Sequence, residues 1–250
     1  ILTQAWFPVC PSKALAVKAA RSVLIFKQRV VVFRGEDKKV RALDAFCPHM
    51  GADLGNGTVV NNQIQCYFHQ WRFDGNGQLC HIPCTTDLPK NARARAYPVE
   101  EKYGFIWVYS AAEAPYPVPS PPGLEEQQLA AAHIKLATLY AHHHVMMANG
   151  IDLQHFSAVH NLDVEFDFEV DDQNDLVFDW NLEGEIPDQG LKNKFLRWLL
   201  GPKVGYRARF AGGSIVSLTY GPEQRFRGKG FKFPPLHILW GCLPQTDGIS

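Results

Sequence analysis

Two short stretches decide the fold of the amino-terminal half: CPHMGADL at residues 47–54 and CYFHQW at residues 66–71. Each stretch pairs one cysteine with one histidine and lies beside glycine-rich or turn-rich sequence. Two loops of this kind can bring two thiolates and two imidazoles to one point, and such a donor set binds metals. The candidate ligands are Cys47, His49, Cys66 and His69.

The donor set suits two kinds of metal centre. A Rieske 2Fe–2S cluster needs two cysteines on one iron and two histidines on the other. Structural zinc also accepts two cysteines and two histidines. Zinc fingers, however, usually pair cysteine with cysteine and histidine with histidine, whereas each loop here carries one of each with unequal spacing. We therefore favour the 2Fe–2S cluster over zinc.

Short strands are predicted around these loops. Segments rich in β-branched and aromatic residues lie at 23–26, 30–33 and 104–109, and the sequence DGNG at 74–77 is a tight turn. These signals predict an all-β domain over residues 1–113. The region from 114 to 123 is dense in proline, which predicts a stiff linker.

Residues 124–250 are expected to form a second domain. Helical periodicity runs from Met146 to Val159, and the alternating segments 176–180 and 214–220 predict an antiparallel sheet. The expected fold class is therefore α+β and mostly β.

The charge balance argues against one class of partner. The chain has 250 residues, with 25 lysines and arginines against 25 aspartates and glutamates. A nucleic-acid binder normally carries a basic excess, so we expect no nucleic-acid partner. No apolar run approaches the length of a membrane helix. We expect a cytoplasmic protein, and membrane association of a longer chain stays open.

The two loops resemble the Rieske domain of the Rieske non-heme iron oxygenases. The resemblance rests on the two stretches above together with GTV at 57–59 and Asp74-Gly75, and it runs from about residue 6 to 109. It implies a 2Fe–2S cluster bound by the four candidate ligands. Two loop positions depart from the family, because Tyr67 stands where many members have proline and Gln70 where many have glycine.

A second motif, DLQHFSAVH, occupies residues 152–160. On a regular helix, His155 and His160 point about 140° apart, so a shared metal would require a helix break or a π-type turn. The resemblance implies that both histidines bind a mononuclear Fe(II). It also implies that Asp152 bridges a cluster histidine of a neighbouring subunit to His155. No carboxylate completes this site, Asp247 being a poor candidate, and we expect the chain to be incomplete at its C-terminus.

The resemblance is strongest to the cholesterol 7-desaturase and 3-ketosteroid 9α-hydroxylase branch. It implies a helix-grip catalytic domain that uses O2 to hydroxylate or desaturate a bulky apolar substrate, sterol-like or otherwise polycyclic. Electrons would come from NAD(P)H through a ferredoxin or reductase, and the subunits would form a homotrimer or another head-to-tail ring. The alternative is an electron-transfer or redox-sensing protein without a working mononuclear iron site.

One further segment allows two interpretations. Residues 191–200, LKNKFLRWLL, interleave basic residues with aromatic and aliphatic ones. The segment could contact a membrane or a lipid-like substrate, or it could be a helix packed over the substrate pocket. The packed helix is the favoured interpretation.

Overall fold

The computed structural model describes residues 4–122, 124, 129, 132, 138–159, 164–220 and 236–244. Most described residues in regular structure belong to antiparallel strands, so the expected mostly-β α+β class is confirmed. The chain divides into two compact units. The first contains residues 1–118, 130–143 and 242–250, and the second contains residues 119–129 and 144–241.

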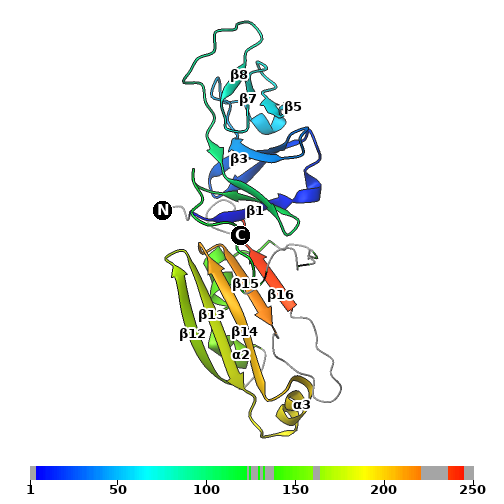
Figure 1. Ribbon diagram of the computed structural model, residues 1–250, viewed down its shortest axis with the longest axis vertical. Coiled ribbons are helices and arrows are strands. Elements are labelled where there is room, and N and C mark those ends of the chain that lie inside the picture. Colours follow the sequence, from blue (N-terminus) through cyan, green and yellow to red (C-terminus); the bar gives the residue numbers. More distant parts are fainter. Residues whose placement is uncertain are drawn as a thin grey trace. The chain divides into compact units, whose positions relative to one another are not determined.

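The first unit holds three small sheets (Figure 1). Their strand orders are β1-β11-β10, β2-β3-β4-β9 and β5-β6-β7-β8. Two 3-10 turns, η1 (Ser12–Ala14) and η2 (Leu54–Asn56), lie between strands. The strands are β1 (Trp6–Pro11), β2 (Ala20–Ile25), β3 (Gln28–Arg34), β4 (Val40–Asp44), β5 (Thr58–Val60), β6 (Gln63–Gln65), β7 (Arg72–Phe73), β8 (Leu79–His81), β9 (Ala96–Tyr97), β10 (Val99–Lys102) and β11 (Phe105–Tyr109).

Two hydrophobic clusters stabilise this unit. One packs side chains of β1, β2, β3 and β11 together. The other gathers Phe33, Leu43, Leu54 and other apolar residues around Cys47 and Cys66. The two candidate thiol ligands are therefore part of the core, and packing fixes the bases of both loops.

The second unit is built on one five-stranded antiparallel sheet in the order β12-β13-β14-β15-β16 (Figure 1). Both segments that were predicted to alternate lie in this sheet. The helices are short, and no helix among the described residues is long and apolar enough to cross a membrane. The elements are α1 (His143–Ala148), α2 (Leu153–Ala158), β12 (Glu165–Asn174), β13 (Val177–Glu185), α3 (Leu191–Leu200), β14 (Lys203–Ala211), β15 (Ile215–Tyr220) and β16 (Leu236–Gly241).

The sequence predicted one continuous helix from Met146 to Val159, and this prediction is wrong. The chain leaves the helix at Asn149 and re-enters it at Leu153, so α1 and α2 are separate. Asp152 has extended backbone angles, and its carboxylate caps α2 by accepting hydrogen bonds from the N–H groups of Gln154 (3.0 Å) and His155 (3.4 Å). An aspartate at this position favours a helix start over continuation of the preceding helix.

Candidate metal centre

The two loops that carry the candidate ligands share one backbone design. In the first, the Cys47 carbonyl accepts the N–H of Gly51 (2.8 Å), and the Cys47 N–H donates to the Ala52 carbonyl (2.8 Å). In the second, the Cys66 carbonyl accepts the N–H of Gln70 (3.1 Å), and the Cys66 N–H donates to the Trp71 carbonyl (2.9 Å). The same turn closes each loop, so each cysteine is held at the base of its loop.

Both turns require a left-handed residue at the same place. Gly51 has φ +73° and Gln70 has φ +59°. This conformation suits glycine, and a residue with a Cβ adopts it at a cost. The departure noted at position 70 is therefore a backbone feature, because Gln70 occupies a position whose geometry favours glycine.

The two thiols lie side by side in the core. Cys47 is 3% exposed and Cys66 is 1% exposed, and neither forms a disulfide. Burial raises the pKa of the Cys47 thiol to about 11, and the adjacent Cys66 adds to the rise. Backbone hydrogen bonds from His49 and Met50 act in the opposite direction. Such N–H donors stabilise a thiolate when a metal replaces the proton.

The two imidazoles lie at the exposed tips of the loops. His49 and His69 are both exposed, and their ring centroids are 4.6 Å apart in an edge-on arrangement. The site is therefore polarised, with thiols toward the core and imidazoles toward solvent. A 2Fe–2S cluster with one cysteine-bound and one histidine-bound iron fits this arrangement, because its two irons need different donors on opposite sides.

Aromatic side chains hold both imidazoles. The Trp71 indole stacks on the His49 ring with centroids 4.3 Å apart and planes only 6° from parallel. The ring centroids of Phe68 and His69 lie 4.0 Å apart, and the two ring planes are inclined by 40°. Trp71 is half-buried against the core and belongs to the second loop, so its contact with His49 joins the two loops. Spacing alone gave no signal for this contact.

Asp53 connects the first loop to neighbouring strands. Its carboxylate accepts hydrogen bonds from Ser22 Oγ (2.5 Å), the Gly55 N–H (2.8 Å) and Arg29 Nη1 (2.9 Å). Burial acts to raise the pKa of this carboxyl. The three hydrogen bonds together with the Arg29 charge outweigh it and hold the pKa below its usual range. Asp53 thus ties the first loop to strands β2 and β3.

The second motif is described only in part. Asp152 is the exposed N-terminal cap of α2, and His155 lies on the first turn of that helix, half-buried. His160 and Asp247 lie outside the described residues. α2 ends at Ala158, so a regular helix does not continue from His155 to position 160. The helix break that a shared metal would require is compatible with this end point.

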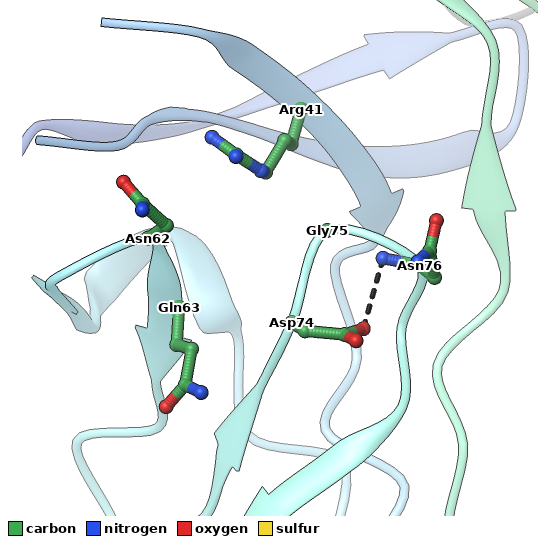
Figure 2. A pocket seen from close by; sticks show the side chains of 6 residues that line it. All are labelled: Arg41, Asn62, Gln63, Asp74, Gly75 and Asn76. Carbon is green, nitrogen blue, oxygen red and sulfur yellow. Dashed lines mark hydrogen bonds between the residues drawn. The ribbon is translucent and has the colours of Figure 1, made fainter. Parts of the chain in front are cut away.

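The cavities in the first unit are separate from the ligand loops. One of about 400 Å³ lies among Arg41, Asn62, Gln63, Asp74, Gly75 and Asn76 (Figure 2). This cavity lies where β6 begins and β7 ends. Cys66 follows the end of β6 and Trp71 precedes the start of β7, so the ligand loop lies at the opposite end of this antiparallel strand pair. Another cavity, of about 700 Å³, is lined by residues 80–86 and Leu88. Neither contains a candidate cluster ligand.

Comparison with known proteins identifies a domain within the first unit. Residues 5–93 match the family model of the Rieske [2Fe-2S] domain. A cholesterol 7-desaturase of Bombyx mori is 35% identical over 160 residues, which cover 62% of this chain and 35% of that protein. A probable 3-ketosteroid-9-alpha-monooxygenase oxygenase component of Rhodococcus rhodochrous is 46% identical over 84 residues, covering 33% of this chain and 21% of that protein.

A similar fold also occurs in solved structures. The structure of dicamba monooxygenase bound to dicamba matches with a TM-score of 0.67 at 21% identity, covering 99% of this chain and 75% of that chain. At this identity the likeness shows a shared fold. The chain spans about a third of the length of the cholesterol 7-desaturases that it matches.

Proposed function

We propose that this chain, which carries a Rieske [2Fe-2S] domain and is related to the Rieske oxygenases, is the oxygenase component of an O2-dependent system. The observation that carries the proposal is the polarised donor set on two matched loops. Relatives named as desaturase and monooxygenase favour this function over an electron-transfer or redox-sensing protein.

In this proposal the four loop residues hold the cluster. Cys47 and Cys66 would bind one iron from the core side, and His49 and His69 would bind the other at the surface. The cluster would supply one-electron chemistry, and a mononuclear iron held by His155 and His160 would supply dioxygen activation. The protein's task is to hold the four donors rigidly and to keep the thiols dry.

Asp152 is assigned as a bridge between subunits. Its carboxylate would accept a hydrogen bond from His69 of a neighbouring copy and orient His155 in its own chain. The capping interaction supports this role, because the carboxylate is already fixed at the start of the helix that carries His155. A bridge of this kind requires a head-to-tail ring such as a homotrimer.

The relatives supply the expected substrate class. We infer a bulky apolar substrate, sterol-like or polycyclic, to be hydroxylated or desaturated by a catalytic domain that we place at 124–250, after a Rieske domain at 1–113 and a linker at 114–123. A ferredoxin or reductase would deliver electrons from NAD(P)H. The four cysteines that are not assigned to the cluster, Cys10, Cys80, Cys84 and Cys242, are free thiols, which supports a reducing compartment such as the cytoplasm.

Metal analysis tests the assignment of the ligands. We expect two acid-labile sulfides per chain, a reduced-state paramagnetic signal and, where a carboxylate completes the mononuclear site, three irons. Cys66→Ser should lose the sulfide and the visible absorption, whereas the matched control Cys84→Ser, at an exposed thiol, should keep both. A colourless protein with stoichiometric zinc would refute the cluster, and two irons with intact sulfide would favour the electron-transfer protein.

Oxygen uptake tests the reaction. The full-length protein, a ferredoxin, its reductase and NADH would be assayed against sterols, ketosteroids and other polycyclic compounds, with products identified by mass spectrometry. Uptake that depends on the substrate and yields a hydroxylated or desaturated product supports the proposal. If no compound raises the uptake above background, while the cluster is reduced normally, the oxygenase assignment fails.

A further inference from the structure

α3 is a helix bounded by glycines at the end of a hairpin. It fills the connection between β13 and β14 and lies beyond the ends of these strands (Figure 1). Gly190 (φ +79°) precedes it and Gly201 (φ +91°) follows it, and both have open space where a Cβ would stand. Glycines with positive φ and extended ψ at both ends, a conformation that other residues rarely adopt, allow the chain to leave and rejoin the sheet abruptly, so α3 forms a discrete segment.

One side of α3 faces the body of its unit. Arg197 donates a hydrogen bond from Nη1 to the carbonyl of Ile186, a residue that is only 1% exposed. Asn193, Leu196 and Arg197 are half-buried. These three positions lie on one face of the helix, because residues three and four apart are neighbours on its surface.

The opposite side exposes an apolar stripe. Leu191 is 90% exposed, Phe195 is 58% exposed and Trp198 is 66% exposed. The three residues are spaced i, i+4, i+7 and fall within about 60° of arc on the helix surface. Large apolar side chains this exposed on one stripe indicate a surface that is covered when the protein works. The expectation that α3 packs over the substrate pocket stays a prediction, and the exposed stripe lies on the side of the helix that faces away from its unit.

Charge selects what covers the stripe. Lys192 and Lys194 are both exposed and lie on either side of it, and Lys203 follows the helix. The helix itself contains no acidic residue; exposed Asp188 and Glu185 precede it. Aromatic and aliphatic side chains flanked by lysines are the composition of helices that lie in the interface of an anionic membrane.

We propose that α3 docks this protein onto the surface of an anionic membrane. Leu191, Phe195 and Trp198 enter the boundary between headgroups and acyl chains, and Lys192 and Lys194 contact lipid phosphates. The helix is too short to span a bilayer, since ten residues extend only about 15 Å. Contact is therefore peripheral, and its strength depends on both the apolar stripe and the lysines.

Vesicle sedimentation tests the proposal with the cluster-loaded chain. We would compare vesicles of phosphatidylcholine alone with vesicles containing three parts in ten of phosphatidylserine. Binding to the anionic vesicles should be at least about tenfold stronger. Each lysine near an anionic surface contributes about fivefold to binding, so Lys192→Glu/Lys194→Glu should weaken binding by well over tenfold.

Matched variants separate a local surface from net charge. Lys38→Glu/Lys39→Glu changes the charge equally on the first unit, at two exposed lysines, and should alter binding by less than the variant on α3. Phe195→Ser/Trp198→Ser should weaken binding about tenfold while leaving the circular dichroism melt unchanged, because both residues are exposed. Equal loss in both lysine variants, or unchanged binding of the serine variant, would overturn the proposal.

A second copy of the chain is the competing occupant of the stripe. Sedimentation velocity without lipid distinguishes it. If the wild type associates through α3, Phe195→Ser/Trp198→Ser would lower its mass, and the proposal would be wrong. None of these measurements involves oxygen turnover, so their outcome is independent of the proposed activity.

Discussion

The left-handed residues of the two ligand loops allow a reciprocal test of backbone strain. Gly51 and Gln70 occupy the same place in the two turns, with φ +73° and +59°. No atom lies within 4 Å of a Cβ built on Gly51, so alanine there meets no steric obstacle beyond its own backbone. Gln70→Gly should therefore stabilise the first unit, and Gly51→Ala should destabilise it.

The expected size follows from two opposing contributions. A residue with a Cβ pays about 1–2 kcal/mol in the left-handed region. Glycine loses about 0.5–1 kcal/mol more conformational entropy on folding. The difference leaves about 0.5–1 kcal/mol of stabilisation for Gln70→Gly and an equal loss for Gly51→Ala. For a unit of this size the melting temperature shifts by about 3–5 °C in opposite directions.

The assay is thermal unfolding of the cluster-loaded protein, followed by the visible absorption of the cluster. Gln70→Ala is the control, because it removes the side chain but retains the Cβ and its strain, and its melting temperature should stay within about 1 °C of the wild type. Equal stabilisation by alanine and glycine at position 70 would show that the glutamine side chain, and not the backbone, is responsible.

Three further changes test the remaining parts of the site. Asp53→Ala should cost about 2 kcal/mol in denaturant unfolding, because it removes the hydrogen bond from the Gly55 N–H that caps η2 and the two hydrogen bonds from Ser22 and Arg29. The folded pKa of Asp53 lies below the unfolded value near 3.8, so this contribution is complete above about pH 4 and is lost as the pH falls through the folded pKa. Trp71→Leu should speed cluster loss to a chelator by about 2–10-fold, since ring stacking contributes about 0.5–1.5 kcal/mol. Asp152→Asn should keep the helix cap and the bound metals but abolish coupled turnover, measured as product formed per NADH oxidised.

Each of these changes has its own control. Asp53→Asn keeps an acceptor but cannot titrate, so a pH profile still matching the wild type would contradict the assignment to Asp53. Trp71→Phe keeps an aromatic face and should restore slow cluster loss; a rate equal to that of Trp71→Leu would exclude stacking. Normal coupling in Asp152→Asn would show that Asp152 only caps α2.

The sequence contained the donors but not their support. The pairing of cysteine with histidine in each loop predicted the centre, because ligand identity is local chemistry. The stack of Trp71 on His49 and the contact of Ser22 with Asp53 join residues distant in sequence, so they depend on tertiary packing that spacing does not encode. The left-handed Gln70 was visible only as a departure from the family pattern until its backbone angle was known.

In the second unit, too, local patterns were predictable from the sequence and tertiary features were not. Alternation predicted its strands, since a half-buried sheet needs a period of two. The predicted continuous helix was wrong because the capping preference of Asp152 overrode the apolar periodicity around it. The position of α3 outside the ends of β13 and β14 depends on two positive-φ glycines, Gly190 and Gly201, whose backbone angles the sequence does not reveal.

The burial of Cys47 and Cys66 makes them internal reporters of loop motion in the cluster-free chain. An alkylating reagent reaches these thiols only when a loop opens, whereas exposed Cys84 is accessible at once. The alkylation rate of the buried thiols relative to that of Cys84 therefore measures how often the empty loops open. Insertion of iron and sulfide into the folded, cluster-free chain must wait for the same opening.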